Sequence, residues 1–180
     1  MNHRVGDILL RRIEPKDLDA LYDQKNDPEV AALLGGFTTG YSRGELKDWL
    51  EHHRKRPDEC MWAIARLEDD TCLGHVGFYQ IDHRIRSAEF AIMIGDRTRW
   101  GSGIGYACTK FAINYGFGEL NLNRIHLSTL SSNERAIRLY QALGFHEEGR
   151  LRQAQYKGGH YLDVILMALL RAEYDEELRR

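Results

Sequence analysis

The stretch Arg99-Trp100-Gly101-Ser102-Gly103-Ile104-Gly105 decides the fold of this chain of 180 residues. It joins a continuously apolar run, Phe90 to Ile94, to residues 104–117, which have the pattern of a long helix. A run that is apolar on both faces is typical of a central strand. Three glycines within five residues let the backbone approach a ligand closely and point several N–H groups one way. Because the helix dipole adds its positive end, the turn is predicted to bind phosphate.

Two familiar nucleotide-binding motifs do not match this turn. The dinucleotide fingerprint G-x-G-x-x-G would have its third glycine in a different place. The acidic residue expected about 20 positions further on is also missing, since that region reads Leu122-Asn123-Arg124-Ile125. The P-loop ends in Gly-Lys-Ser/Thr, which the turn lacks. The turn therefore predicts a phosphate ligand of another kind, or else glycines that serve only the loop.

A second motif is Asn133-Glu134-Arg135-Ala136-Ile137-Arg138-Leu139-Tyr140, followed by Leu143-Gly144-Phe145. Asn133 and Tyr140 are seven residues apart, two helical turns, so both side chains face the same way. A polar cap at one end and a phenol near the other can line a narrow ligand channel. The alternative is an ordinary N-cap asparagine and an aromatic residue at the edge of the core.

Outward from these motifs, the hydrophobic pattern predicts an α/β protein with a mixed sheet and helices on both faces. Strands are expected at residues 8–13, 60–67, 72–82, 86–94, 124–130, 146–154 and 160–170. Helices are expected at residues 17–26, 42–56, 104–117 and 133–143, with a short helical turn at 28–34. The second of these helices opens with the capping box Ser42-Arg43-Gly44-Glu45.

The composition narrows the function classes. A composition of 43% hydrophobic and 29% charged residues predicts one soluble globular domain over residues 1–180. Residues 171–180 are expected to form a polar C-terminal tail. The net charge of -2 gives no basic excess for a nucleic-acid partner. No window approaches the roughly 18 apolar residues of a membrane span, and the first residues lack a signal-peptide pattern. The three cysteines lack metal-type spacing, so we expect a cytoplasmic protein with reduced thiols and no metal.

Together the two motifs resemble those of the GNAT acetyltransferase superfamily, whose signature is Gln/Arg-x-x-Gly-x-Gly/Ala followed by an Asn…Ala…Tyr…Leu-Gly-Phe helix. Trp100 stands in place of the usual Gln or Arg, as in the branch that includes ribosomal-protein acetyltransferases. The resemblance covers nearly the whole chain and extends to spermidine acetyltransferases through Ala88-Glu89-Phe90 and Ile81-Asp82-His83. It implies a mainly antiparallel twisted sheet of about seven strands with about four helices, splayed where acetyl-CoA binds.

The resemblance implies an acetyl-CoA-dependent N-acetyltransferase that uses acetyl-CoA as cosubstrate. Tyr140 is then the acid that assists the leaving thiolate. Glu89 is our candidate base, directly or through water, because a protonated amine must lose a proton before it attacks. The alternative role for Glu89 is a strand carboxylate or substrate anchor. The residues expected to hold the coenzyme are Ile92, Met93, Ile94, Arg99, Gly101, Ser102, Gly103, Ile104, Gly105, Tyr106, Asn133 and Ala136.

The acceptor is expected to be the primary amine of a small molecule, with polyamines, amino sugars and amino acids as candidates. The segment Leu33-Leu34-Gly35-Gly36-Phe37-Thr38-Thr39-Gly40 lacks the carboxylates of spermidine-type relatives, which weakens the polyamine case. Alternatives are a ribosomal-type protein N-terminal acetyltransferase, which predicts an open groove, and a non-catalytic acyl-CoA-binding domain. The sequence is compatible with a homo-oligomer, and no nucleic-acid or membrane partner is expected.

Overall fold

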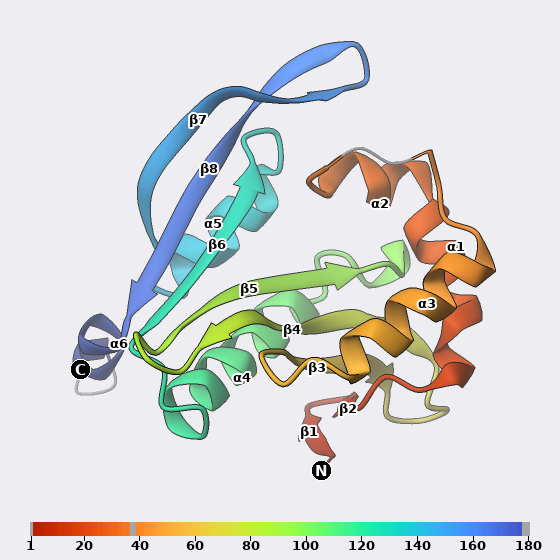
Figure 1. The fold of residues 1–180 in the computed structure, drawn as a ribbon, viewed down its shortest axis with the longest axis horizontal. Coiled ribbons are helices and arrows are strands. Elements are labelled where there is room, and N and C mark those ends of the chain that lie inside the picture. Colours follow the sequence, from red (N-terminus) through yellow and green to blue (C-terminus); the bar gives the residue numbers. More distant parts are fainter. Residues whose placement is uncertain (1, 37–38, 178–180) are drawn as a thin grey trace.

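A single sheet organises the molecule, which is described by a computed structural model over residues 2–36 and 39–177 (Figure 1). Within these residues the strand order is β1-β2-β3-β4-β5-β6-β8-β7. All neighbouring strands are antiparallel except β5 and β6, which are parallel. The strands are His3–Val5 (β1), Ile8–Arg11 (β2), Cys60–Arg66 (β3), Cys72–Asp82 (β4), Ser87–Ile94 (β5), Arg124–Leu130 (β6), His146–Lys157 (β7) and His160–Leu170 (β8).

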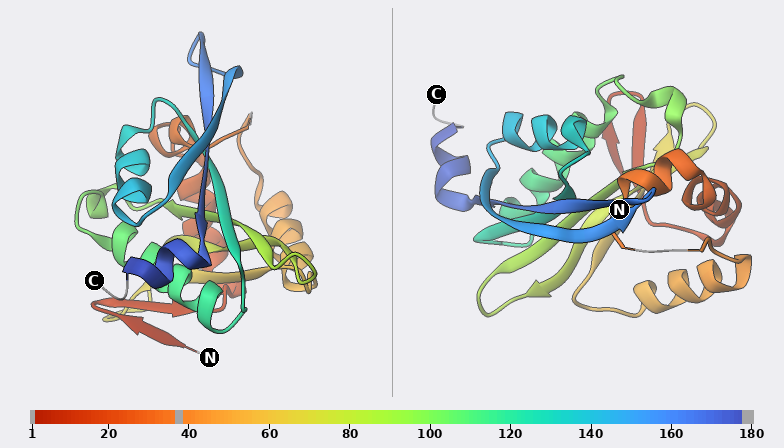
Figure 2. Two further views of the ribbon diagram at one scale, coloured as in Figure 1. Left: turned by 90° about the vertical axis from the view of Figure 1, so that its left-hand side faces the viewer. Right: turned by 90° about the horizontal axis from the view of Figure 1, so that it is seen from above.

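Helices cover both faces of this sheet, as the sequence predicts (Figures 1 and 2). One face carries α1, α2 and α3, and the other carries α4 and α5. The α-helices are Leu18–Asn26 (α1), Pro28–Leu33 (α2), Arg43–Arg54 (α3), Ile104–Gly118 (α4), Glu134–Ala142 (α5) and Arg171–Glu177 (α6). None of them, within the residues described, combines the length and apolar character needed to cross a membrane.

Strand β5 contributes to the core on both sides of the sheet. Its Phe90 packs in the larger cluster with residues of α4 and α5. Its Met93 packs in the second cluster with Leu21 of α1 and Leu50 of α3. This confirms that the apolar run at the end of β5 is a central strand buried on both faces.

The sheet splits between β5 and β6. The two strands pair only from Ser87 to Glu89, opposite Arg124 to His126. Beyond this point β5 continues to Ile94 and β6 to Leu130 without further pairing, and Figure 1 shows them diverging. The splayed sheet that the family resemblance implies is therefore present.

The structure differs from the sequence-based expectation at three elements near the ends of the chain. A short strand, His3–Val5, precedes the predicted first strand. Strand β7 runs to Lys157 rather than residue 154, across an irregular register. Residues 178–180 of the predicted polar tail lie outside the described part of the chain. The rest of the tail, Arg171–Glu177, forms helix α6. The Tyr174 ring of α6 lies 5.0 Å from the Phe117 ring. This end of the chain is therefore a docked helix and not only a tail.

Candidate active site

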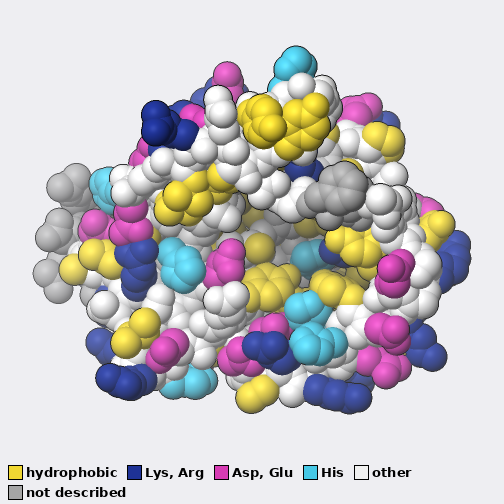
Figure 3. Space-filling view, turned by 45° about the horizontal axis from the view of Figure 1, so that its top comes forward, with side chains coloured by type: hydrophobic (Ala, Val, Ile, Leu, Met, Phe, Trp, Pro, Cys, Tyr) yellow, Lys and Arg dark blue, Asp and Glu magenta, His cyan; other side chains and the backbone are white. Residues whose placement is uncertain are grey.

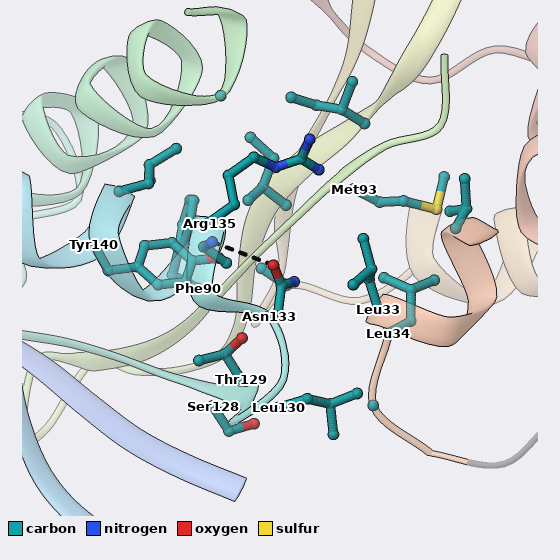
Figure 4. A pocket seen from close by; sticks show the side chains of 18 of the residues that line it. Leu33, Leu34, Phe90, Met93, Ser128, Thr129, Leu130, Asn133, Arg135 and Tyr140 are labelled. Atoms are coloured by element: carbon teal, nitrogen blue, oxygen red, sulfur yellow. Dashed lines mark hydrogen bonds between the residues drawn. The ribbon is translucent and has the colours of Figure 1, made fainter. Parts of the chain in front are cut away.

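A cavity of about 800 Å³ lies in the split between β5 and β6 (Figure 4). Residues from α2, β5, the Gly-rich turn, β6 and α5 line it, together with Gln155 and Val164 of the β7–β8 hairpin. In Figure 4, Tyr140 of α5 and the leucines Leu33 and Leu34 of α2 lie on opposite sides. The space-filling view shows hydrophobic side chains gathered in a hollow of one face, with acidic and histidine side chains at its border (Figure 3).

The Gly-rich turn forms one end of this cavity. Gly101 and Gly103 have φ of 80° and 87°, the left-handed region that favours glycine, and both line the cavity. Gly103 is also the N-cap of α4. Because the first N–H groups of a helix have no acceptor within the helix, those of Ile104, Gly105 and Tyr106 are available at the turn. They suit the phosphate group predicted from the sequence.

Three predicted coenzyme residues in this segment differ in what they offer. Arg99 lines the cavity, and its guanidinium pairs with Asp7 at 2.6 Å, while its buried Nε has no hydrogen-bond partner within the described residues. The Ser102 hydroxyl donates to the Arg99 carbonyl at 2.6 Å, and Ser102 is not among the lining residues. The Ile104 side chain is 4% exposed and packs in the core, which leaves only its backbone for the ligand.

Strand β5 supplies backbone donors along the split. The Gly95 amide donates to the Leu73 carbonyl of the neighbouring strand at 2.8 Å. Since N–H groups alternate in direction along an antiparallel strand, the amides of Ile94 and Ile92 point away from β4 and into the split. The Ile94 carbonyl, which accepts from Trp100 Nε1 at 2.8 Å, confirms this orientation. The Met93 amide faces β4, so Met93 reaches the cavity by its side chain.

Helix α5 carries the second predicted motif along one wall. Asn133 Oδ1 accepts from the Ala136 amide at 3.2 Å, so Asn133 is an N-cap, and both residues line the cavity (Figure 4). The Tyr140 side chain also lines it but is only 7% exposed, between Phe90 and Phe145. Burial raises the pKa of Tyr140 to about 12, so the phenol keeps its proton at neutral pH.

Glu89 stands where the split begins. It is half-buried, lines the cavity, and is opposite Tyr79 on β4 and His126 on β6. From Glu89 to Met93 the pairing with β4 has no bulge, so Glu89, Ala91 and Met93 share the face covered by α1 to α3. Among the described lining residues Glu89 is the one carboxylate.

His75 of β4, opposite Met93 in the register, is not among the residues lining the cavity. It is 6% exposed, its ring lies 5.4 Å from the Trp49 ring, and neither ring nitrogen has a hydrogen-bond partner in the part of the chain that the structure describes. Burial is the main cause that holds the pKa of His75 well below its usual value, so the ring is neutral. No group of three or more His, Cys, Asp or Glu within residues 2–36 and 39–177 is placed to hold a metal ion.

Several lining residues were not predicted from the sequence. Arg135 of α5 is one, and its guanidinium lies 4.3 Å from the centre of the Trp100 ring. Ser128 and Thr129 of β6 are others. Because these residues are consecutive, strand parity does not indicate them, and only the fold reveals where β6 leaves β5 and exposes both.

With this geometry in view, the family assignment is direct. A model of the acetyltransferase (GNAT) domain family matches residues 7–146. The chain therefore belongs to the GNAT acetyltransferase family, and it is an acetyl-CoA-dependent N-acetyltransferase.

Similar proteins of known structure or name agree with this assignment. The chain is 31% identical to the spermidine N(1)-acetyltransferase of Escherichia coli (strain K12), over 93% of this chain and 88% of that protein. It is 28% identical to the putative ribosomal N-acetyltransferase YdaF of Bacillus subtilis, over 94% of each. The structure of a spermidine N-acetyltransferase from Vibrio cholerae in complex with CoA and spermine matches with a TM-score of 0.84 and 28% identity, over 94% of this chain and 98% of that one.

Proposed function

We propose that this enzyme transfers the acetyl group of acetyl-CoA directly to the primary amine of a small molecule, within a ternary complex. The observation that carries the proposal is the cavity itself. It connects the phosphate-type donors of the Gly-rich turn to the Glu89 carboxylate, with the free edge of β5 between them and Tyr140 in the wall. One continuous site can thus hold the coenzyme and an amine at the same time.

In the proposed reaction the amine nitrogen attacks the thioester carbonyl, and Glu89 accepts the amine's proton directly or through water. A backbone N–H of β5, that of Ile92 or Ile94, stabilises the oxyanion of the tetrahedral intermediate. When the C–S bond breaks, Tyr140 donates a hydrogen bond and then its proton to the departing thiolate. Glu89 then releases its proton to solvent, and solvent supplies a proton to the Tyr140 phenolate.

Among small amines we propose a polyamine as the acceptor, which the spermidine acetyltransferases among the relatives support. Glu89 would receive the reacting ammonium. The stretch 33–36 contributes leucines and glycines to the cavity and no carboxylate, while residues 37 and 38 lie outside the described part. We therefore expect a polyamine to be held mainly at its reacting end, with weak selection for its further charges.

A small acceptor is favoured over a protein N-terminus by the way the cavity is enclosed. Lys157 Nζ, at the tip of the β7–β8 hairpin, donates to the Ala31 carbonyl of α2 at 2.7 Å. This bridge joins the two walls that carry Gln155 and Leu33. The open groove expected of a ribosomal-type enzyme would have to pass through it.

A panel of amines tests the proposal. Spermidine, spermine, an amino sugar, an amino acid and a peptide with a free N-terminus are each incubated with acetyl-CoA, and thiol release is followed with mass analysis of the product. The proposal predicts acetylated polyamine and little acetylated peptide from the wild type, and a Lys157→Met variant, which lacks the bridge, should gain activity toward the peptide. Acetylation of the peptide alone would contradict a small-molecule acceptor.

A further inference from the structure

Position 100 lacks the cationic or amide side chain that the family signature places beside the coenzyme. The Trp100 indole instead donates from Nε1 to the Ile94 carbonyl at 2.8 Å, which fixes the ring at the end of β5. Trp100 lines the cavity. A neutral indole gives a phosphate no charge, so a cation for this end of the site has to come from another residue.

Arg135 provides such a cation from α5. It lies two residues beyond the N-cap Asn133, lines the same cavity, and places its guanidinium 4.3 Å from the centre of the Trp100 ring. Within the described residues no carboxylate lies within ion-pair distance of Arg135. An arginine held against an aromatic face keeps its planar N–H donors free along its edge.

The other arginines near the turn each pair with a carboxylate. Arg99 pairs with Asp7 at 2.6 Å. Arg138 pairs with Glu134 at 3.0 Å, one turn along α5. Arg97 lies 3.2 Å from Asp27 and also pairs with Glu29. Within the described residues, Arg135 is the arginine of this group that forms no ion pair, so an anionic ligand bound to it displaces no carboxylate.

Arg135 of α5 lies beside the turn that precedes α4, because its guanidinium stacks on Trp100. A Cβ added at Gly105 would lie 3.0 Å from Leu139 Cδ1, so the first turn of α4 packs closely against α5. Gly105 and Arg135 both line the cavity, and Figure 4 shows the Arg135 side chain extending from α5 along it. The unpaired N–H groups of α4 and the Arg135 guanidinium thus supply positive potential to one space.

We propose that Arg135 binds a phosphate group of the coenzyme and that Trp100 positions it for this task. The proposal rests on the proposed function, because it requires the coenzyme in this cavity. Guanidinium groups bind phosphate oxygens through two parallel hydrogen bonds, which lysine or an exposed, unrestrained side chain does less well. The Trp100–Arg135 stack does the work that the signature residue would do from position 100.

The first test compares coenzyme forms. Arg135→Gln should raise the Kd for acetyl-CoA about 10- to 100-fold, the range for a lost hydrogen bond to a charged group. Its Kd for acetyl-pantetheine, which has no phosphate, should match that of the wild type. An Arg97→Gln control removes an equal but compensated charge near the turn and should change the Kd for acetyl-CoA by less than about threefold. Acetyl-3′-dephospho-CoA identifies the phosphate, because an undiminished effect assigns the pyrophosphate and a lost effect assigns the 3′-phosphate.

The second test concerns positioning. Trp100→Leu should weaken acetyl-CoA binding when Arg135 is present but add little to Arg135→Gln, since both changes remove the same contact. If Trp100→Leu does not fold, Arg135→Lys, which keeps the charge without the planar fork, should bind with intermediate affinity. Equal losses for acetyl-CoA and acetyl-pantetheine, or wild-type affinity in a folded Arg135→Gln protein, would overturn the inference. Failure of the wild type to bind acetyl-CoA would instead overturn the proposed function.

Discussion

Replacing Gly103 by valine separates the fold of the Gly-rich turn from its role in binding. Gly103 has φ of 87°, and a Cβ built on it meets no other atom within 4 Å. The substitution therefore costs backbone strain of roughly 1–2 kcal/mol without a steric clash inside the protein. For a chain of this size, the melting temperature of the unliganded protein should fall by about 2–8 °C.

The same side chain would project where the pyrophosphate should lie, because Gly103 lines the cavity at the N-terminus of α4. At 100 times its Kd, acetyl-CoA stabilises the wild type by about 2.7 kcal/mol, or about 5–11 °C in melting temperature. Gly103→Val should lose this shift entirely. Gly103→Ala, with a smaller side chain and less strain, provides a second variant if the valine protein is too unstable.

Gly158 is the matched control for this experiment. It also has a positive φ, 58°, with nothing within 4 Å of an added Cβ, but it lies in the β7–β8 turn and does not line the cavity. Gly158→Val should show a similar loss of melting temperature yet keep the full shift with acetyl-CoA. A folded Gly103→Val protein with the wild-type shift would refute the role of the turn in holding phosphate.

Three further substitutions test the chemistry and one buried charge. Tyr140→Phe should bind acetyl-CoA normally but lose roughly 100-fold in kcat, and an unchanged kcat with chemistry rate-limiting would remove the phenol from the reaction. Glu89→Gln should greatly lower kcat/KM for a cationic amine at constant coenzyme affinity. A Glu89→Gln rate that recovers at high pH indicates a base, whereas a raised KM without recovery indicates an anchor. Lys25 lies over the rings of Trp49 and Tyr41, and burial lowers its pKa to about 8. Between pH 8 and 10.5 the unfolded chain therefore binds a proton at Lys25 that the folded protein does not. The free energy of unfolding of the wild type, measured in urea, should rise over this range relative to that of Lys25→Met. If the free energies of unfolding of the two proteins change in parallel with pH, the lowered pKa of Lys25 is wrong.

The elements that the sequence predicted correctly are those with a strong apolar pattern. Strand β5 buries residues on both faces, and helix α4 buries a continuous stripe of residues at helical spacing, so their hydrophobic patterns mark both position and type. Strand β1 has only three residues, too few for a hydrophobic pattern, and the far part of β7 is exposed, so it has no alternation of apolar residues to reveal it. Gln153, with φ of 51°, lies in the irregular stretch of β7, where simple strand parity fails.

The candidate site also has features that the local sequence predicts and features that only the folded structure reveals. The turn at Gly101 and Gly103 could be predicted because it depends on the backbone freedom of glycine, a local property. The contact of Arg135 with Trp100 could not, since it exists only when α5 packs beside the end of β5. His75 shares a sheet face with Met93, its partner in the register, yet Trp49 lies against it, and no pattern within one strand indicates that cover.

A crystal structure of the enzyme with CoA and a polyamine tests the central claim most directly. The account predicts the pyrophosphate against the N–H groups of Ile104 and Gly105, the pantetheine arm along the free edge of β5, and the sulfur near Tyr140. The reacting amine should lie beside Glu89. A coenzyme bound elsewhere with the split empty, for example in the shallow pocket lined by Arg4, Arg66 and Arg99, would contradict the account.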